Sequence, residues 1–339
     1  MQVELLKDRL LSQYTTLKIG GVADYVAVVK TEEELVQALQ FAKQTVAPVL
    51  ILGEGSNVLC RDEGYQGVVI LNRISGYTAK IKNNSETFLT IGAGENLDKS
   101  IARTVEDGLW GLENLSSIPG TIGATPVQNV GAYGVEVADL IETVNAVHID
   151  SLEKKIFSKA ECGFGYRDSF FKTPAGKKWC VTSVTYALST VPKPVLHYKD
   201  LATLQTENET DQNKIREHVA KVRSEKFPDW NIVGTAGSFF KNPIIKKELF
   251  IELQKTYEDI PGHENEFGDV KVSLGWILDK VCNLKGFTKG RVGLYQNQAL
   301  VLVTEIGATA KEVDLFVDEI KKLVAEKTNI KIEREVLTV

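Results

Sequence analysis

The sequence is poor in the residues that build metal sites and disulfide frameworks. Its 339 residues include only four cysteines and four histidines. The cysteines (Cys60, Cys162, Cys180 and Cys282) lie far apart without a C-x-x-C spacing, and no histidine stands at metal-ligand spacing from a cysteine or an acidic residue. We therefore expect reduced, partly buried thiols, as in a cytoplasmic protein, and no bound metal.

The chain also lacks an excess of positive charge. Its 40 basic and 45 acidic residues give a formal net charge of −5, whereas nucleic-acid binding calls for clustered lysine and arginine. Residues 1–6 lack the basic and apolar regions of a signal peptide. Nothing resembles a heptad repeat or an exposed apolar helix face. We therefore expect a cytoplasmic monomer that binds neither nucleic acid nor membrane.

The sharpest local absence is that of charge between Glu113 and Glu136, in a chain that is 25% charged. The centre of this segment, residues 118–134, contains four glycines and two prolines, which interrupt helices and strands. Such a segment can present backbone N–H groups to a phosphate-bearing cofactor, or it can be a plain glycine-rich connection. A membrane span is excluded, because it needs about 20 mostly apolar residues.

A second glycine motif, Gly-Glu-Gly-Ser-Asn at residues 53–57, follows a predicted buried strand at 48–52. Its glycines permit positive φ, and successive N–H groups can form an anion-binding nest. The spacing matches neither the Rossmann fingerprint nor the P-loop. Alone, this motif could be a simple connection. Paired with the uncharged segment, it predicts the second wall of a pyrophosphate site.

The rest of the chain predicts mixed α and β structure. Strands are expected at 25–29, 48–52, 68–71, 88–93, 144–149, 179–188, 299–304 and 330–336. Helices are expected at 32–42, capped by Thr31, and at 97–107, 211–223, 273–282 and 310–326. A polar, turn-rich stretch at 190–213 is expected to end the second of three parts, which we place at 1–65, 66–205 and 206–339.

Six motifs, taken in order, give the sequence a specific resemblance. Besides 53–57 and 118–124 they are Gly-Tyr-Arg-Asp-Ser at 165–169, Arg-Ser-Glu-Lys-Phe-Pro at 223–228, Gly-Ser-Phe-Phe-Lys-Asn-Pro at 237–243 and Glu-Arg-Glu-Val at 333–336. From about residue 14 to the last residue, the chain resembles the UDP-N-acetylenolpyruvoylglucosamine reductase family. The resemblance implies an α+β fold. It has a two-subdomain FAD-binding domain of the PCMH/vanillyl-alcohol-oxidase type and a C-terminal α+β substrate-binding domain, whose last strand returns to the active site.

The same resemblance implies an NADPH-dependent flavoenzyme of peptidoglycan precursor biosynthesis. It reduces UDP-N-acetylglucosamine enolpyruvate to UDP-N-acetylmuramate, and NADPH and the sugar nucleotide use one site in turn. Neither glycine motif contains a histidine or cysteine for a covalent tether, so we expect non-covalent FAD. The preference for NADPH over NADH rests on the resemblance alone. A flavin-dependent sugar or alcohol oxidase and a non-catalytic sugar-nucleotide-binding protein remain as alternatives.

The chemistry requires a bound carboxylate, a stabilised enediolate and one delivered proton. Arg167 lies in an aromatic, glycine-flanked stretch and could bind a carboxylate bidentately, or it could pair with Asp168 at the surface. Glu333 and Glu335 share one face of the predicted strand at 330–336. The resemblance selects Glu335 and makes it, with Arg167, the stabiliser of the intermediate.

Ser238 is expected to donate the proton. A serine hydroxyl is a very weak acid, but an enediolate carbon is basic enough to accept its proton. Gly237 before it and two phenylalanines after it indicate a tight turn in an apolar pocket, and a serine in an ordinary Gly-Ser loop is the alternative reading. The proton-donating role is implied by the resemblance.

The resemblance also assigns binding residues. Those for the cofactor are Gly53, Glu54, Gly55, Ser56, Asn57, Ile118, Pro119, Gly120, Thr121, Ile122, Gly123, Ala124, Gln128, Asn129, Gly131, Ala132 and Arg223. Those for the substrate are Tyr133, Tyr198, Lys226, Asn242, Lys271, Lys285 and Gln298. Lys271 and Lys285 could equally be solvated surface charges. Tyr198 resembles the mobile-loop tyrosine of one of the two family subtypes and assigns the chain to that loop-bearing subtype, although its neighbours His197 and Lys199 depart from the usual pattern.

Overall fold

A computed structural model describes residues 3–206 and 211–339, and the internal contacts divide the chain into two units. The first comprises Met1–Arg9, Ala23–Glu54 and Tyr65–Arg223, and the second Leu10–Val22, Gly55–Gly64 and Ser224–Val339. The chain therefore changes unit five times, and one of these changes falls inside the first glycine motif, after Glu54. The division at 1–65, 66–205 and 206–339 stays a prediction. Residues 1–2, and residues 207–210 of the predicted polar stretch, lie outside the described residues.

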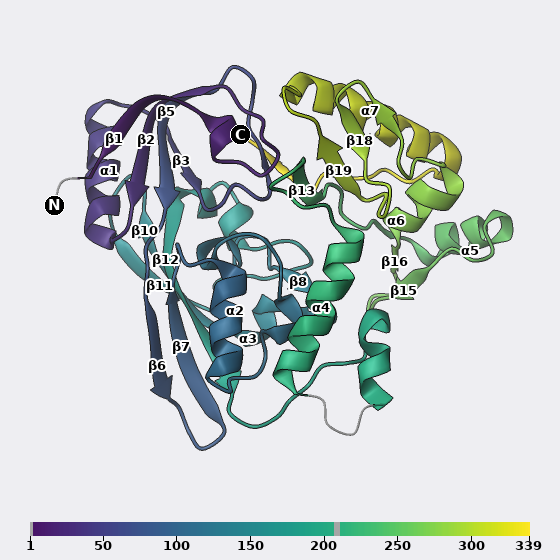
Figure 1. The fold of residues 1–339 in the computed structure, drawn as a ribbon, viewed down its shortest axis with the longest axis horizontal. Coiled ribbons are helices and arrows are strands. Elements are labelled where there is room, and N and C mark those ends of the chain that lie inside the picture. Colours follow the sequence, from purple (N-terminus) through teal and green to yellow (C-terminus); the bar gives the residue numbers. More distant parts are fainter. Residues whose placement is uncertain (1–2, 207–210) are drawn as a thin grey trace. The chain divides into compact units, whose positions relative to one another are not determined.

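The first unit begins with a four-stranded sheet in the order β1-β2-β5-β3 (Figure 1). Its strands are β1 (Leu5–Leu10), β2 (Val22–Val29), β3 (Val49–Leu52) and β5 (Tyr65–Asn72), and its helix is α1 (Glu32–Gln44). The β2–β5 and β3–β5 pairs are parallel, and α1 packs Leu35 and Leu39 into one core with Ile70 of β5. Thr31 accepts the N–H of Glu34 and caps α1, as expected. The first glycine motif begins directly after β3 of this sheet.

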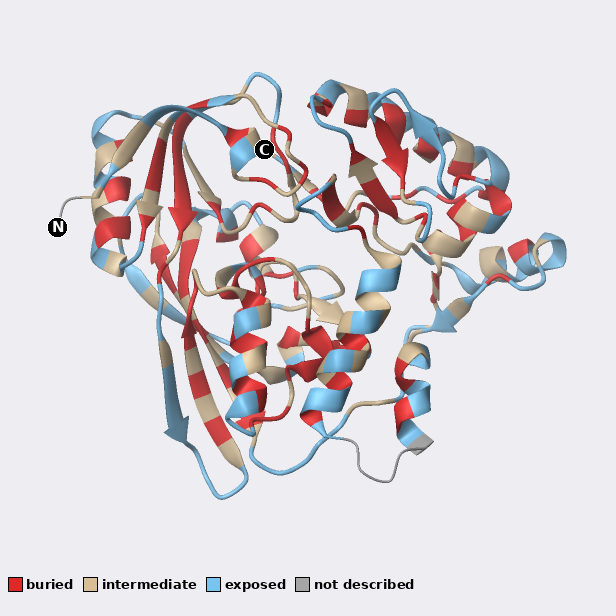
Figure 2. Cartoon of the chain, viewed as in Figure 1, coloured by how far each residue is buried: buried red, intermediate tan, exposed pale blue. Residues whose placement is uncertain are grey.

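A five-stranded antiparallel sheet in the order β11-β10-β12-β7-β6 forms the larger part of the first unit. Its strands are β6 (Tyr77–Ile81), β7 (Glu86–Gly92), β10 (Ile141–His148), β11 (Lys154–Ser158) and β12 (Trp179–Ser189). Figure 2 shows buried residues on the central strands and an exposed edge strand β6. Helix α2 (Leu97–Glu106) buries Leu97 and Ile101 with Leu89 and Ile91 of β7. The sheet and α2 together form the scaffold of the uncharged segment.

Short elements and one long helix complete this unit. They are the 3-10 turns η2 (Glu113–Leu115), η3 (Ile122–Ala124), η4 (Phe170–Lys172), η5 (Gly176–Lys178) and η6 (Lys199–Thr206), with β8 (Gly131–Ala132), β9 (Val135–Glu136), α3 (Val137–Leu140) and α4 (Gln212–Lys226). Ile215 and Val219 of α4 are buried together with Leu201, Leu204 and Tyr133. This cluster fixes α4 against the η6 stretch and the end of the uncharged segment.

The second unit contains three small sheets, in the orders β13-β19-β18-β17, β14-β16-β15 and β20-β4. Their strands are β4 (Val58–Leu59), β13 (Gly234–Ser238), β14 (Ile244–Ile245), β15 (Gly262–Glu264), β16 (Val270–Val272), β17 (Thr288–Lys289), β18 (Val292–Leu294), β19 (Val301–Thr304) and β20 (Leu337–Thr338). Its helices are η1 (Leu11–Gln13), α5 (Lys247–Thr256), α6 (Leu274–Trp276), the π-helix η7 (Ile277–Val281) and α7 (Ala310–Thr328). A capping box of Thr309 and Glu312 begins α7, whose Val313 and Val317 pack in the core with Leu302 of β19.

The second unit departs from the sequence expectations at the C-terminal strand, in the type of one helix and at α5. The strand expected at 330–336 is a single bridge at Arg334 followed by β20. Its alternation is real, because Ile330, Ile332 and Val336 are buried, but the chain there lacks a continuous strand partner. The helix expected at 273–282 is present at 274–281, but it is one turn of α6 that widens into the π-helix η7, so only its type differs. Helix α5 was not expected, since Leu253 is the one fully buried residue among its ten.

Each of the four cysteines is a buried free thiol. Burial raises the pKa of the Cys60, Cys162 and Cys180 thiols to about 12, and Asn72 partly offsets the effect at Cys180. Within residues 3–206 and 211–339, no helix combines the length and apolar character needed to cross a membrane. The same residues contain no cluster of three histidine, cysteine or acidic side chains that could hold a metal ion.

Candidate active site

The two predicted cofactor motifs meet in the first unit at Glu54. Its carboxylate accepts the N–H of Gly120 at 2.9 Å and the Asn96 amide at 2.7 Å. A Cβ added to Gly53 would lie 2.4 Å from Oγ1 of Thr121, so the close approach of the motifs requires glycine there. The sequence prediction that the motifs form two adjacent walls matches these contacts.

These motifs can offer hydrogen bonds to an anion. Among the described residues, none accepts a hydrogen bond from the backbone N–H groups of Gly53, Glu54 or Thr121. Gly120 has a φ of 127°, a conformation that L-residues with side chains avoid. Unpaired N–H groups on two adjacent glycine turns are the donors that a diphosphate accepts. The residues therefore fit the pyrophosphate of FAD, which the N–H groups of Gly53, Glu54 and Thr121 would hold.

The end of the uncharged segment is joined to the arginine motif. Arg167 donates from Nη2 to the Gly131 carbonyl at 2.7 Å, and Asn129 donates from Nδ2 to the Gly165 carbonyl at 3.0 Å. Gly165 and Asp168 exchange two backbone hydrogen bonds, which makes the arginine motif a tight turn. Lys172 donates to the carbonyl of Arg167 at 3.0 Å. The half-buried Arg167 is thus held from its guanidinium and from its backbone.

Four residues in these segments have a strained backbone. Ser117, Asn129, Tyr133 and Arg167 have φ values of 61°, 47°, 49° and 53°, in the left-handed region that residues other than glycine seldom occupy. Each lies in or directly beside a motif singled out from the sequence. Such strain concentrates where a site must hold groups in defined positions.

Two predicted substrate tyrosines contact each other in the first unit. The rings of Tyr133 and Tyr198 pack edge to face with centroids 5.5 Å apart. Asn114 donates to the Tyr133 carbonyl at 2.8 Å. Burial raises the pKa of the Tyr133 hydroxyl, although a hydrogen bond from Arg223 opposes the shift. The tyrosines and Arg223, assigned to substrate and cofactor respectively, therefore form one cluster.

In the second unit, three predicted motifs converge on the C-terminal segment. The N–H of Glu335 donates to the Phe239 carbonyl at 2.9 Å, one residue after Ser238. Asn57, at the end of the first glycine motif, donates from Nδ2 to the Glu335 carbonyl at 3.4 Å and accepts the Leu337 N–H at 3.1 Å. The chain folds this way because β20 pairs with β4 directly after Asn57. Residues nearly 280 positions apart in sequence thus become neighbours.

The predicted proton donor lies on a distorted strand. β13 pairs with β19, with a register shift between Thr235 and Ser238. Gly237 has a φ of 70°, and an added Cβ there would meet nothing within 4 Å, so the backbone conformation and not space requires glycine. The next residue after Ser238, Phe239, is fully buried. The half-buried Ser238 therefore lies between the left-handed Gly237 and the hydrophobic core.

The structure distinguishes the two C-terminal glutamates. The Glu333 side chain is 77% exposed and lies 3.7 Å from the Lys241 ammonium. Glu335 is half-buried. The exposed Glu333 is suited to a surface ion pair, and the choice of Glu335 for the reaction agrees with its burial.

The predicted substrate residues of the second unit are partly brought together. Asn242 accepts the Leu274 N–H at 3.0 Å, and Lys271 pairs with Ile244, two residues after Asn242. Asn297, beside Gln298, donates to the Glu225 carbonyl at 2.8 Å and so lies next to the end of α4 that carries Lys226. Lys285 has a different kind of contact, an ion pair in which its ammonium lies 3.8 Å from the Asp279 carboxylate.

Sequence reasoning missed four residues that organise the cofactor motifs. Arg73 donates to the Gly53 carbonyl at 3.0 Å, Asn96 binds Glu54, and Asp98 and Arg216 pair near Ser117. Asn96 has one visible signal, since it precedes the predicted helix at 97–107 as a typical N-cap. Nothing in the sequence indicates its contact with a residue 42 positions earlier.

Comparisons with known proteins match this arrangement. Residues 23–151 match a family of FAD-binding domains, and residues 228–339 match the C-terminal domain of UDP-N-acetylenolpyruvoylglucosamine reductases. The fold and the glycine motifs thus define an FAD-containing oxidoreductase with a second, dedicated domain. The predicted α+β fold class is confirmed.

Whole-chain relatives agree. The UDP-N-acetylenolpyruvoylglucosamine reductase of Salmonella choleraesuis is 38% identical over 327 residues, which are 96% of this chain and 94% of that protein. The Escherichia coli K12 reductase is 37% identical with the same coverage. The crystal structure of the Thermus caldophilus reductase has a TM-score of 0.68 and 28% identity, covering 100% of this chain and 99% of that one. The chain belongs to the UDP-N-acetylenolpyruvoylglucosamine reductase family.

Proposed function

We propose that this chain uses NADPH and FAD to reduce UDP-N-acetylglucosamine enolpyruvate to UDP-N-acetylmuramate, a step in peptidoglycan precursor biosynthesis. Family membership over almost the whole chain supports this activity. The observation that carries it is the convergence of Asn57, Phe239 and Glu335 in the second unit. There the end of a cofactor motif, the neighbour of the predicted proton donor and the predicted stabilising carboxyl are joined by backbone contacts.

The chain's residues have separate tasks in this reaction. FAD, held by the two glycine motifs, would supply hydride transfer from NADPH to the enol double bond. Arg167, held by Gly131 and Lys172, presents a permanent positive charge that can bind the substrate carboxylate and stabilise the charge that develops on it. Glu335 is proposed to act on the same intermediate, and its backbone is fixed through Phe239 and Asn57.

Ser238 is proposed to complete the reaction by giving its hydroxyl proton to the α-carbon. A hydroxyl can protonate a carbanion-like carbon because that carbon is a stronger base than ordinary oxygen or nitrogen acceptors. The left-handed Gly237 and the buried Phe239 restrict the backbone on both sides of Ser238. A fixed donor approaches the carbon from one face, so the product should form with a single configuration.

The remaining site assignments form part of the proposal. The two glycine motifs and Arg223 are assigned to FAD, and Tyr133, Tyr198, Lys226, Asn242, Lys271, Lys285 and Gln298 to the sugar nucleotide. A cytoplasmic monomer is proposed, supported by the four free thiols and the absence of an association motif in the sequence. Sedimentation equilibrium at micromolar concentration tests the monomer.

A product assay tests the function. The purified yellow protein is incubated with NADPH and UDP-N-acetylglucosamine enolpyruvate without oxygen, and UDP-N-acetylmuramate is quantified against the NADPH consumed. We expect one product for each NADPH. In a parallel incubation in air without NADPH, consumption of the substrate would instead identify an oxidase. A colourless protein that releases no flavin on denaturation would identify a binding protein.

A further inference from the structure

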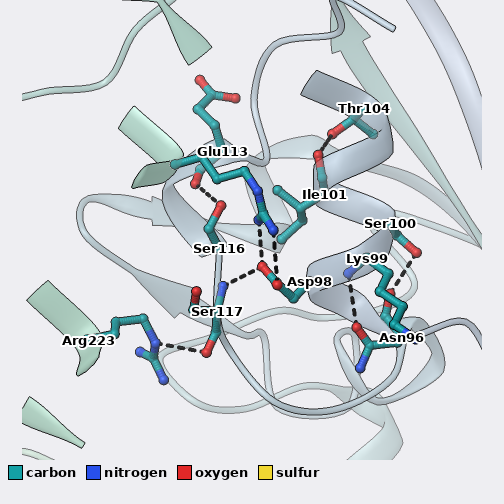
Figure 3. A network of polar contacts seen from close by, with 11 residues as sticks. Asn96, Asp98, Lys99, Ser100, Ile101, Thr104, Glu113, Ser116, Ser117 and Arg223 are labelled. Carbon is teal, nitrogen blue, oxygen red and sulfur yellow. Dashed lines mark hydrogen bonds and ion pairs between the residues drawn. The ribbon is translucent and has the colours of Figure 1, made fainter. Parts of the chain in front are cut away.

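A polar network in the first unit holds the residue that leads into the uncharged cofactor motif (Figure 3). Ser117 immediately precedes residues 118–124 and has a φ of 61°. Its N–H donates to Oδ1 of Asp98 at 2.6 Å, and its carbonyl accepts from Nε of Arg223 at 3.0 Å. Both backbone groups of this strained residue are therefore fixed by charged side chains.

Asp98 is in turn held by Arg216. Nη1 and Nη2 of Arg216 donate to the two carboxylate oxygens of Asp98 at 2.5 Å and 3.0 Å, which is the paired geometry that makes arginine–carboxylate contacts strong. The side chain of Asp98 is 32% exposed and that of Arg216 is 24% exposed, so solvent screens the pair only in part. Asp98 also lies in the first turn of α2, where the helix dipole favours a negative charge.

The same turn of α2 reaches both cofactor motifs. Asn96 caps the helix by accepting the Lys99 N–H and binds Glu54 of the first motif. Two residues later, Asp98 binds Ser117 at the entrance to the second motif. The start of α2 therefore sets the spacing between the two walls.

Helix α4 supplies both arginines. Arg216 and Arg223 are seven residues apart, which places them on one face of a helix. Between them, His218 contacts the Asp200 carbonyl through Nε2 at 2.7 Å, two residues after Tyr198. α4 thus touches the stretch carrying Tyr198 and the entrance to the cofactor motif.

The carboxyl of Asp98 is ionised at neutral pH. Burial disfavours ionisation of this carboxyl, but hydrogen bonds from Arg216 and from the Ser117 N–H outweigh burial and hold its pKa below the ordinary value. An ionised Asp98 keeps both Ser117 and Arg216 as partners. The network is therefore complete when Asp98 is ionised.

We propose that Asp98 and Arg216 are positioning residues for FAD, which hold Ser117 in its left-handed conformation and so fix the nearby Thr121 N–H for the pyrophosphate. This inference rests on the FAD dependence of the proposed function. It assigns the pair no contact with the reacting atoms. Its consequence is a specific loss of FAD affinity when the pair is broken.

The test measures FAD release from the holoenzyme. Asp98→Asn and Arg216→Met are diluted, and flavin fluorescence gives the FAD dissociation constant, which we expect to rise about tenfold, the usual scale for losing a partly buried ion pair. Activity at low FAD should fall in both variants and recover with excess FAD. Asp150→Asn, which removes the exposed pair with Lys178 in the same unit, is the control and should release FAD as the wild type does.

A second substitution separates positioning from general stability. Glycine adopts positive φ without strain, so adding Ser117→Gly to Arg216→Met should restore part of the lost FAD affinity. No restoration, together with a fall in thermal stability that explains the FAD loss, would overturn the inference. Wild-type FAD affinity in Asp98→Asn would also overturn it, and would leave the proposed reaction standing. A wild-type protein that binds FAD but reduces no enolpyruvyl sugar nucleotide would contradict the function alone.

Discussion

At the scale of single residues, the site depends on positions where the backbone conformation or the burial of a charge is unfavourable in free energy. Gly53 allows the two cofactor motifs to approach, Gly237 turns the chain before Ser238, and Arg167 accepts a left-handed conformation without being glycine. Glycine at the first two positions is readable from sequence as a turn signal. The strain at Arg167 is not, because any residue can be drawn into it by surrounding contacts.

Glu113, where the uncharged segment begins, makes a contribution to the free energy of unfolding that depends on pH. Burial raises the pKa of its carboxyl, against the hydrogen bond that it accepts from the Gly111 N–H at 2.7 Å, and its Oε1 finds no partner among the described residues. A raised pKa in the folded state means that the contribution of this group to stability is present below the ordinary pKa and is lost as pH rises through the raised value.

We therefore expect Glu113→Gln to be more stable than the wild type at neutral pH, by about 1 kcal/mol. Glutamine keeps an acceptor for Gly111 and cannot ionise, so the difference should disappear as pH falls below the ordinary glutamate value. Urea unfolding at both ends of this pH range measures it. A stability difference independent of pH would show that ionisation of Glu113 has no part in it.

Ser238→Ala should separate the two halves of the reaction. Without the hydroxyl, NADPH should reduce the flavin at the wild-type rate, whereas turnover should fall by roughly a hundredfold or more, the usual scale for losing a positioned acid. Stopped-flow absorbance of each half-reaction measures this. Ser85→Ala, at an exposed loop, serves as control. Near-normal turnover of the alanine variant at Ser238 would remove this residue from the proton-donating role.

At the scale of elements, the C-terminal segment matters most because it has little regular structure of its own. Arg334 anchors it to α7 through Asp314 at 2.6 Å and forms the bridge with Phe240. Asp314 also pairs with Arg61, near β4. Burial opposes ionisation of Asp314, yet the two arginines hold its pKa below the ordinary value. One carboxylate thus ties α7, the chain beyond β4 and the segment carrying Glu335.

Asp314→Asn should loosen this segment. We expect a loss of about 1–2 kcal/mol in unfolding free energy, because two arginines lose their shared charged partner, and a lower kcat because Glu335 is less well held. Chemical denaturation and steady-state kinetics measure the two effects. Asp318→Asn is the matched control, since Asp318 is 71% exposed and 3.9 Å from Arg334. Equal effects of both substitutions would contradict a special role for Asp314.

At the scale of the whole molecule, the sequence predicts motifs better than the contacts that join them. Local patterns predicted α1, α2, α4, α7 and the central strands, because capping residues and apolar periodicity are short-range signals. The strand expected at 330–336 failed because alternation reports burial and not a partner strand. The contacts of Asp98 with Arg216, and of Asn57 with Glu335, were out of reach, since they join residues 118 and 278 positions apart.

The central claim is that one flavin passes a hydride from NADPH to the enolpyruvyl sugar nucleotide. The most direct measurement is flavin absorbance during anaerobic sequential mixing. We expect NADPH to bleach the flavin, the bleached enzyme to persist, and UDP-N-acetylglucosamine enolpyruvate alone to restore the yellow form. Return of colour only on admitting oxygen would contradict the account.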